Sequence, residues 1–170
     1  MNSRRGYAVG ISHGQSSIIF GGYDGTSHNP GLSSTEIITE QGVSPGPEMP
    51  ESVHYHAIAS VNETTSIITG GWTNGRSAKT WFFNHVSQQF QAGPSLITGK
   101  TGHASTTIQD HITMENIVAV IGGCCDNNGL LLDSTELLIN GESTWQQGKN
   151  HEMCLFASLV GGILFLMLFC

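Results

Sequence analysis

The chain has 170 residues, of which 22 are glycine and only 11% are charged, and its formal net charge is −7. This composition is typical of a turn-rich β protein and excludes a disordered, highly charged chain. The basic residues form no cluster beyond Arg4-Arg5, so the sequence lacks the electrostatic footprint of a nucleic-acid-binding protein.

Residues 5–50 are predicted to form a first unit of four short strands. Two apolar runs flank the turn Ser12–Gln15, which is the pattern of a β-hairpin. A glycine pair ends the second run, and a polar loop leads to a β-branched third run that favours a strand. The predicted strands are residues 7–11, 17–20 and 34–39, with a short fourth strand around residues 41–43.

Two further units, residues 51–98 and 99–150, repeat this order. In the second unit the predicted strands are residues 56–61, 66–69, 80–83 and a fourth near 88–90. In the third unit they are residues 102–108, 117–121, 134–139 and a fourth near 143–145. No stretch longer than one turn keeps a helical period before residue 150, so the sequence predicts an all-β fold.

The most regular feature of the chain is a glycine doublet after the second strand of each unit. The first glycines of the doublets recur at intervals of 49 and 52 residues, which indicates a repeat. A glycine pair lets the backbone leave the strand with a positive φ, or approach a neighbour where a Cβ would clash. The repeat glycines are Gly21, Gly22, Gly70, Gly71, Gly122 and Gly123.

This pattern resembles the kelch repeat over about residues 5–150. The doublets match the most specific element of that family, and Trp145 matches its tryptophan near the fourth strand. Val43 and Phe90 stand at the equivalent positions and depart from the family, and its third-strand tyrosine is absent. The resemblance implies three four-stranded kelch-type blades of a β-propeller. Because propellers usually have four to eight blades, we expect the chain to be part of a larger propeller or a truncated product.

The resemblance also implies a non-enzymatic module that binds a protein partner through the loops at the blade ends. Loops on a rigid scaffold are where binding usually resides. We therefore expect an unidentified protein partner at the loops that follow the doublets, with no cofactor, no metal and no nucleic acid. The candidate binding residues are Tyr23, Asp24, Trp72, Asn74, Arg76, Asp126 and Asn127.

An enzyme is the alternative class, because some kelch-like propellers of the galactose-oxidase type hold copper with tyrosine and histidine ligands. Here tyrosine occurs only at positions 7, 23 and 55. The full ring that would bring such ligands together is also missing. We therefore expect no enzymatic activity. A remnant of a galactose-oxidase-like propeller enzyme is the alternative to the protein-binding module.

Two recurring pairs of residues invite a chemical interpretation, and for each we favour a structural role. His56 and His103 each precede an alanine at the start of strand one, aligned with Tyr7. Their recurrence indicates repeat packing rather than a metal site. Glu36 and Glu136 each follow Ser-Thr at one repeat position, and we expect inter-strand hydrogen bonding rather than paired catalytic carboxylates.

The cysteines and one asparagine are interpreted in the same way. Cys124 and Cys125 are adjacent and cannot form an unstrained disulfide, so we expect a structural or incidental role. Asn62 lies in a glycosylation acceptor pattern, which we interpret as an ordinary turn. No apolar signal-peptide core follows the first residues, so a cytoplasmic location is expected.

The tail, residues 151–170, permits two interpretations. Residues 153–170 carry no charge, and as a helix they would be about 27 Å long, at the short end of what spans a bilayer. A C-terminal membrane anchor would then hold the repeats in the cytoplasm. The other interpretation is a partial fourth unit, because Leu155–Val160 keeps the register of strand one and Gly161-Gly162 would form its turn.

Overall fold

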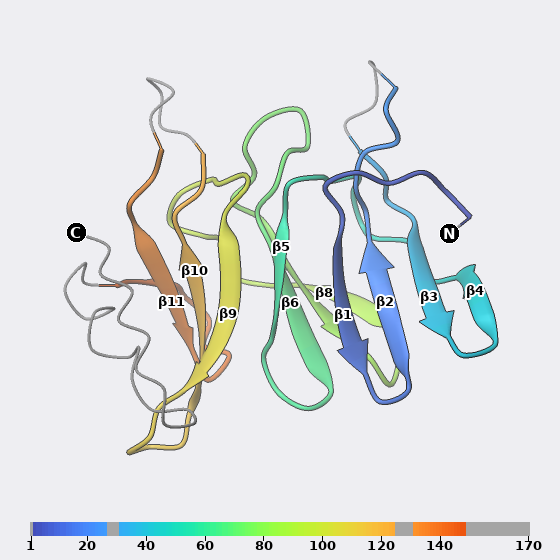
Figure 1. The fold of residues 1–170 in the computed structure, drawn as a ribbon. Coiled ribbons are helices and arrows are strands. Elements are labelled where there is room, and N and C mark those ends of the chain that lie inside the picture. Colours follow the sequence, from blue (N-terminus) through green and yellow to red (C-terminus); the bar gives the residue numbers. More distant parts are fainter. Residues whose placement is uncertain (1, 27–30, 125–130, 149–170) are drawn as a thin grey trace, which may run out of the picture.

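The computed structural model describes residues 2–26, 31–124 and 131–148. In this part of the chain there are twelve strands and no helix (Figure 1). The strands are β1 (Val9–His13), β2 (Ser16–Phe20), β3 (Thr35–Thr39), β4 (Gly42–Pro45), β5 (Ala57–Ser60), β6 (Thr65–Thr69), β7 (Thr80–Asn84), β8 (Gln89–Ala92), β9 (Ala104–Gln109), β10 (Asn116–Ile121), β11 (Thr135–Ile139) and β12 (Gln146–Gln147).

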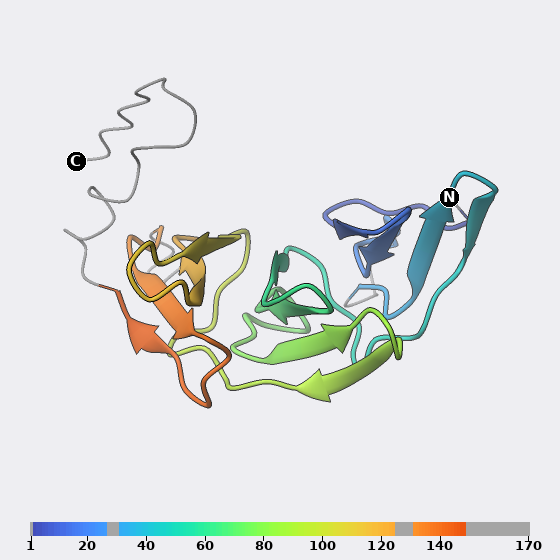
Figure 2. The ribbon, with the colours of Figure 1, turned by 90° about the horizontal axis from the view of Figure 1, so that it is seen from below.

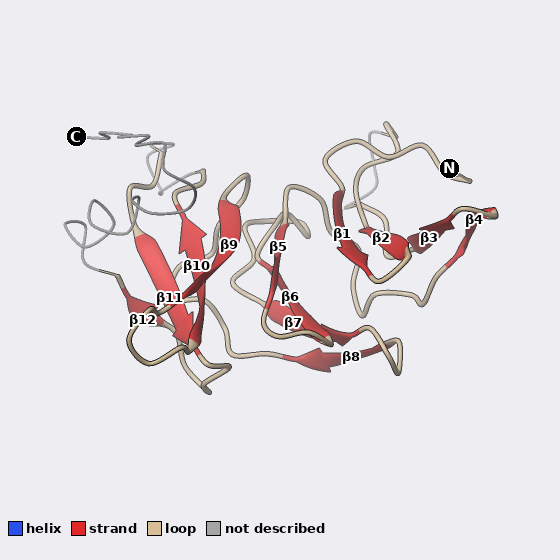
Figure 3. Cartoon of the chain, turned by 60° about the horizontal axis from the view of Figure 1, so that its bottom comes forward, coloured by secondary structure: helices blue, strands red, loops and turns tan. Residues whose placement is uncertain are grey.

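The strands form three four-stranded antiparallel sheets, each built from consecutive strands (Figure 3). We call β1–β4 sheet 1, β5–β8 sheet 2 and β9–β12 sheet 3. Within each sheet every strand pairs with the next one along the chain. The prediction of an all-β fold is confirmed.

The three sheets stand side by side in an arc (Figure 2). Their first strands lie on the inner side of the arc, where β5 contacts both β1 and β9. The fourth strands, such as β4 and β8, lie on the outer side. Pro45 at the end of β4 suits this place, because an edge strand tolerates a residue that lacks an N–H group.

The core consists of two hydrophobic clusters, one on each side of sheet 2. Ile67 and Ile68 are adjacent in β6, and neither is more than 1% exposed. Since successive side chains of a strand point to opposite faces, Ile68 packs toward sheet 1 and Ile67 toward sheet 3. Full burial of such a side chain is worth about 1.5–3 kcal/mol, so both neighbours stabilise the central sheet.

The fourth strands keep one register across the repeats. Val43 pairs with Ile38 in sheet 1, and Phe90 pairs with Phe83 at the same place in sheet 2. Trp145 directly precedes β12 and is buried, and its indole Nε1–H donates to the Pro94 carbonyl at 2.8 Å. This indole therefore ties sheet 3 to the segment that leaves sheet 2.

The predicted start of the first strands is wrong. Tyr7, Tyr55 and Gly102 have φ values of 54°, 56° and 60°, so the backbone there is left-handed and the strands begin later. The residue before each strand is therefore Ala8, His56 or His103. The proposed alignment of the two histidines with Tyr7 is off by one residue.

No helix long and apolar enough to span a membrane occurs among residues 2–26, 31–124 and 131–148. Both interpretations of the tail, partial fourth unit and membrane anchor, concern residues that lie outside the described part of the chain. The same holds for the predicted binding residues Asp126 and Asn127 and for Cys125.

Candidate partner-binding surface

The glycine doublets lie at the end of the sheets where the second strands finish (Figure 1). In each doublet the first glycine has a φ between 54° and 63° and the second a φ between 96° and 106°. A Cβ built on Gly21 would lie 2.6 Å from the Val53 carbonyl oxygen, and one on Gly70 would lie 2.7 Å from that of Lys100. These positions therefore require glycine both for their φ values and for their close contacts.

The second glycine of each of the first two doublets joins its sheet to the segment before the next sheet. Gly22 N–H donates to the Val53 carbonyl at 2.9 Å, and Gly71 N–H donates to the Lys100 carbonyl at 2.8 Å. Val53 precedes sheet 2 and Lys100 precedes sheet 3. The same hydrogen bond thus recurs from unit to unit.

A second recurring link joins the left-handed residues themselves. Tyr55 N–H donates to the Tyr7 carbonyl at 3.2 Å, and Gly102 N–H donates to the Tyr55 carbonyl at 2.8 Å. A left-handed backbone costs a residue with a Cβ roughly 1 kcal/mol or more. Two of the three units nevertheless place a tyrosine there, and strained residues of this kind concentrate at functional sites.

Four side chains at this end form a continuous series of ring contacts. The rings of Tyr7 and Tyr55 stack with centroids 4.1 Å apart and planes inclined by 26°. His54 lies 5.1 Å from Tyr55 and 5.4 Å from Tyr23, measured between ring centroids. Trp72 is the neighbour of these four residues, because its backbone N–H donates to the His54 carbonyl at 2.7 Å. We call these five side chains the aromatic patch.

The aromatic patch is exposed. Tyr7 is 58% exposed, Trp72 42% and Tyr55 38%. A hydrogen bond with Tyr7 is the main cause that raises the pKa of the Tyr55 hydroxyl, so the two phenols interact as well as stack. The exposed apolar residues Val86 and Met114 are aliphatic and lie in turns at the other end of the sheets.

The predicted binding residues that the structure describes lie at or beside this patch. Tyr23 and Trp72 belong to it, and Asp24 Oδ1 accepts hydrogen bonds within its own turn. Asn74 and Arg76 are exposed in the short loop after Trp72. The sequence analysis missed Tyr7, His54 and Tyr55, although a tyrosine two residues before the first strand of both units was a usable signal.

Glu36 and Glu136 bond to the segments that precede their sheets rather than to a neighbouring strand. Glu36 is 2% exposed and accepts hydrogen bonds from the backbone N–H groups of Asn2 and Ser3 and from Arg5. Burial opposes the ionisation of Glu36, yet these amides and the guanidinium together hold its pKa below the ordinary value. The expectation of hydrogen bonding was right, but the bonding segment precedes the sheet rather than belonging to it.

Sheet 3 repeats this arrangement and sheet 2 lacks it. Glu136 accepts from Ile97 N–H and Thr98 N–H and pairs with Lys100 at 3.4 Å. In sheet 2, Val53 occupies the position of Arg5 and Lys100. Trp81 occupies the position of Glu36 and Glu136. The two charges are therefore present or absent together, a covariation between repeats that the sequence alone could have revealed.

The recurring histidines are buried between the sheets, beneath the doublets. His103 Nε2 lies 2.8 Å from Thr69 Oγ1, and burial, with Lys100 nearby, lowers its pKa to about 4. Among the described residues, neither ring nitrogen of His56 makes a hydrogen bond of ordinary geometry, because Phe20 stands where Thr69 stands in the next unit, and only the Phe20 backbone lies near enough to favour the protonated ring. Burial, followed by the proximity of His103, lowers the pKa of His56 to about 3.

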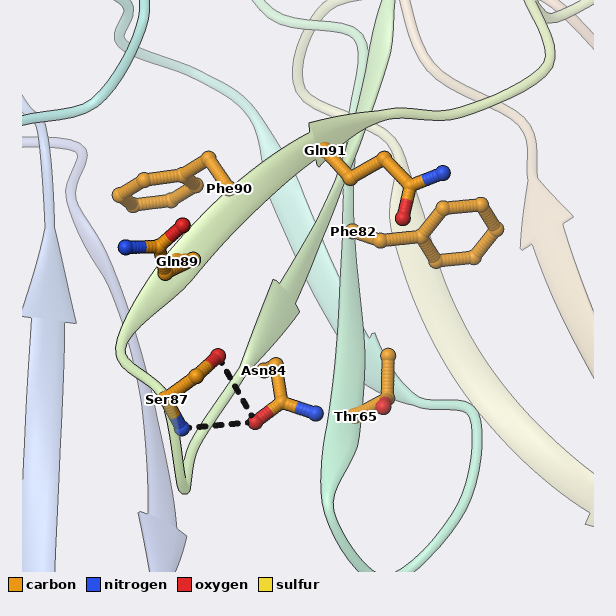
Figure 4. Close-up of a pocket in the computed structure, with 7 residues that line it drawn as sticks. All are labelled: Thr65, Phe82, Asn84, Ser87, Gln89, Phe90 and Gln91. Atoms are coloured by element: carbon orange, nitrogen blue, oxygen red, sulfur yellow. Dashed lines mark hydrogen bonds between the residues drawn. The ribbon is translucent and has the colours of Figure 1, made fainter.

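A hollow of about 490 Å³ lies at the edge of sheet 2. Its lining residues surround the edge strand β8 rather than converge on one space (Figure 4). Phe90 and Phe82 point in different directions from β8 and β7, and Asn84 Oδ1 is occupied by Ser87 N–H and Oγ–H.

The described residues contain no group of three or more His, Cys, Asp or Glu side chains that could hold a metal ion. Cys124 is disulfide-bonded. Asn62 Oδ1 accepts from Thr64 N–H at 3.0 Å, as in an ordinary Asx turn. The chain matches no protein-family model, and no curated protein matches it.

Proposed function

We propose that the chain is an array of kelch-type repeats, in which each four-stranded sheet is one blade of a β-propeller. Three features support this proposal: the doublet after each second strand, the first strands on the inner side of the arc, and identical hydrogen bonds between successive units. The hydrogen bond from Gly22 to Val53 has its counterpart in the bond from Gly71 to Lys100. A repeat in which each unit contacts its neighbour in the same way requires such equivalent bonds.

We further propose that the array binds a protein partner at the doublet end, without catalysing a reaction. The observation that carries this function is the aromatic patch, which presents exposed tyrosine and tryptophan rings on strained, hydrogen-bonded backbone. Tyrosine and tryptophan are enriched in binding hot spots, because they bury a large area at a small cost in conformational entropy.

The test is site-specific photo-crosslinking in cells. A photoreactive phenylalanine analogue replaces Trp72 at the doublet end, or Val86 at the opposite end as the matched control. We expect a discrete crosslinked protein from position 72 and none from position 86. Equal crosslinking from both positions, or none from position 72, would contradict binding at the doublet end.

A further inference from the structure

We propose that the aromatic patch binds an arginine-bearing segment of the partner, through guanidinium groups stacked on its rings. This inference rests on the proposed protein-binding function and names the chemistry that the partner must bring. It follows from two independent observations, the geometry of the rings and the charge of the molecule.

The rings offer open faces that are held in place. Tyr7 stacks on Tyr55 with one face and remains 58% exposed, and Trp72 is 42% exposed. Backbone bonds from Tyr55 to Tyr7 and from Trp72 to His54 fix the residues that carry these rings. A guanidinium is planar and weakly hydrated, so it stacks on tyrosine and tryptophan faces better than an ammonium group does.

The charge of the molecule favours a cationic ligand. Acidic residues outnumber basic residues by 13 to 6 in the chain. Of the five described basic residues, Arg5, Lys79 and Lys100 are held in ion pairs, Arg76 beside the patch already has an interaction partner, and Arg4 is exposed. The excess negative charge therefore attracts a basic segment over a long range, and the rings hold it at short range.

The experiment uses the full chain and three synthetic peptides that differ at one kind of residue. The first peptide carries three arginines separated by glycine and serine. The second has citrulline in place of arginine, which keeps the planar shape without the charge, and the third has lysine. Isothermal titration at low ionic strength gives the dissociation constants. We expect the arginine peptide to bind at least about tenfold more tightly than the citrulline peptide, with lysine between them.

Variants of the patch locate the binding. Trp72→Leu and Tyr7→Leu remove one π face each, and each should weaken the arginine peptide about two- to fivefold. Val86→Ser at the opposite end is the matched surface control and should change nothing. Thermal unfolding of each variant verifies that the sheets are intact.

Equal affinity for arginine and citrulline would overturn the proposal, and so would arginine binding that both Leu variants leave unchanged. These failures differ from failure of the proposed function. If position 72 still crosslinks to one protein, the chain binds a partner of another chemistry. If crosslinking fails while the arginine peptide binds selectively, the patch recognises cations but the protein-binding function is wrong.

Discussion

Arg5 and Glu36 form a buried ion pair that fastens the segment before β1 to the third strand of sheet 1. The distance from Arg5 Nη2 to Glu36 Oε1 is 3.1 Å, and neither side chain is more than 2% exposed. The guanidinium also donates to the carbonyls of Gly21 and Ser34, both at 2.8 Å. One side chain thus links the incoming segment, the doublet and β3, which positions the aromatic patch above them.

Arg5→Met is therefore expected to destabilise the protein strongly. Removing one partner of a buried pair leaves the other charge uncompensated, at a cost of about 3–5 kcal/mol. Chemical denaturation at neutral pH measures the change in the free energy of unfolding. The matched control is Lys79→Met, because Lys79 is 62% exposed and its pair with Glu51 is a surface pair. A surface pair contributes at most about 1 kcal/mol, so equal losses from the two variants would refute this account.

The doublets allow a comparison of two glycines with nearly the same φ. Gly70 and Gly14 have φ values of 58° and 59°. A Cβ on Gly70 would lie 2.7 Å from both Lys100 O and His103 Cε1, whereas a Cβ on Gly14 would meet nothing within 4 Å. Gly14→Ala should cost about 1–2 kcal/mol from strain alone, and Gly70→Ala clearly more. Thermal unfolding checks this order, and a Gly70→Ala variant as stable as Gly14→Ala would show that the contact is not tight.

Much of the fold could be predicted from sequence because its signals are local. The run Ser66–Thr69 followed by Gly70-Gly71 identifies a strand and its exit, and Ile67 and Ile68 place an apolar side chain on each face of that strand. The first strands of units 1 and 3 were predicted to start too early because Tyr7 and Gly102 adopt a left-handed backbone, which the residue type of Tyr7 disfavours. Contacts between units impose this conformation, so no local signal in the sequence specifies it.

The candidate site was predictable only in part for a related reason. Tyr23 and Trp72 follow the doublets directly, so their loops could be identified from the sequence. The stack of Tyr7 on Tyr55 joins residues 48 positions apart, and it forms because adjacent units place them side by side. The partners of Glu36 and Glu136 were missed because they lie outside the predicted strands and more than 30 residues away along the chain.

Acid should destabilise the protein well before its carboxylates are protonated. The pKa values of His56 and His103 are lowered from 6.5 to about 3 and about 4, respectively, in the folded state. The unfolded chain therefore binds more protons below about pH 6.5, and the stability present above that pH is lost as the pH falls. Between about pH 6.5 and pH 5 each histidine should cost about 2 kcal/mol.

Urea unfolding at a series of pH values measures this loss, and His56→Leu isolates one contribution to it. Among the described residues the ring of His56 makes no hydrogen bond of ordinary geometry and has only a weak interaction with the Phe20 backbone, so its replacement removes little polar contact. The variant should lose about half of the pH dependence and keep its stability near pH 5 better than the natural chain does. If the free energy of unfolding of the variant depends on pH as steeply as that of the natural chain, His56 is not buried in its neutral form.

The contact between Tyr7 and Tyr55 can be tested through the titration of one phenol. A hydrogen bond with Tyr7 raises the pKa of Tyr55 above 10.0, because the neutral form of Tyr55 is the one that the neighbour stabilises. The chain has three tyrosines, so the ring carbon that bears each hydroxyl can be followed by NMR as the pH is raised. In Tyr7→Phe the ring remains but the hydroxyl is gone, and the pKa of Tyr55 should fall back toward 10.0. Tyr23→Phe is the matched control, since Tyr23 contacts His54 rather than Tyr55, and it should leave the titration of Tyr55 in place. If Tyr7→Phe does not lower the pKa of Tyr55, the two phenols do not share a hydrogen bond, and the aromatic patch is held by its backbone bonds alone.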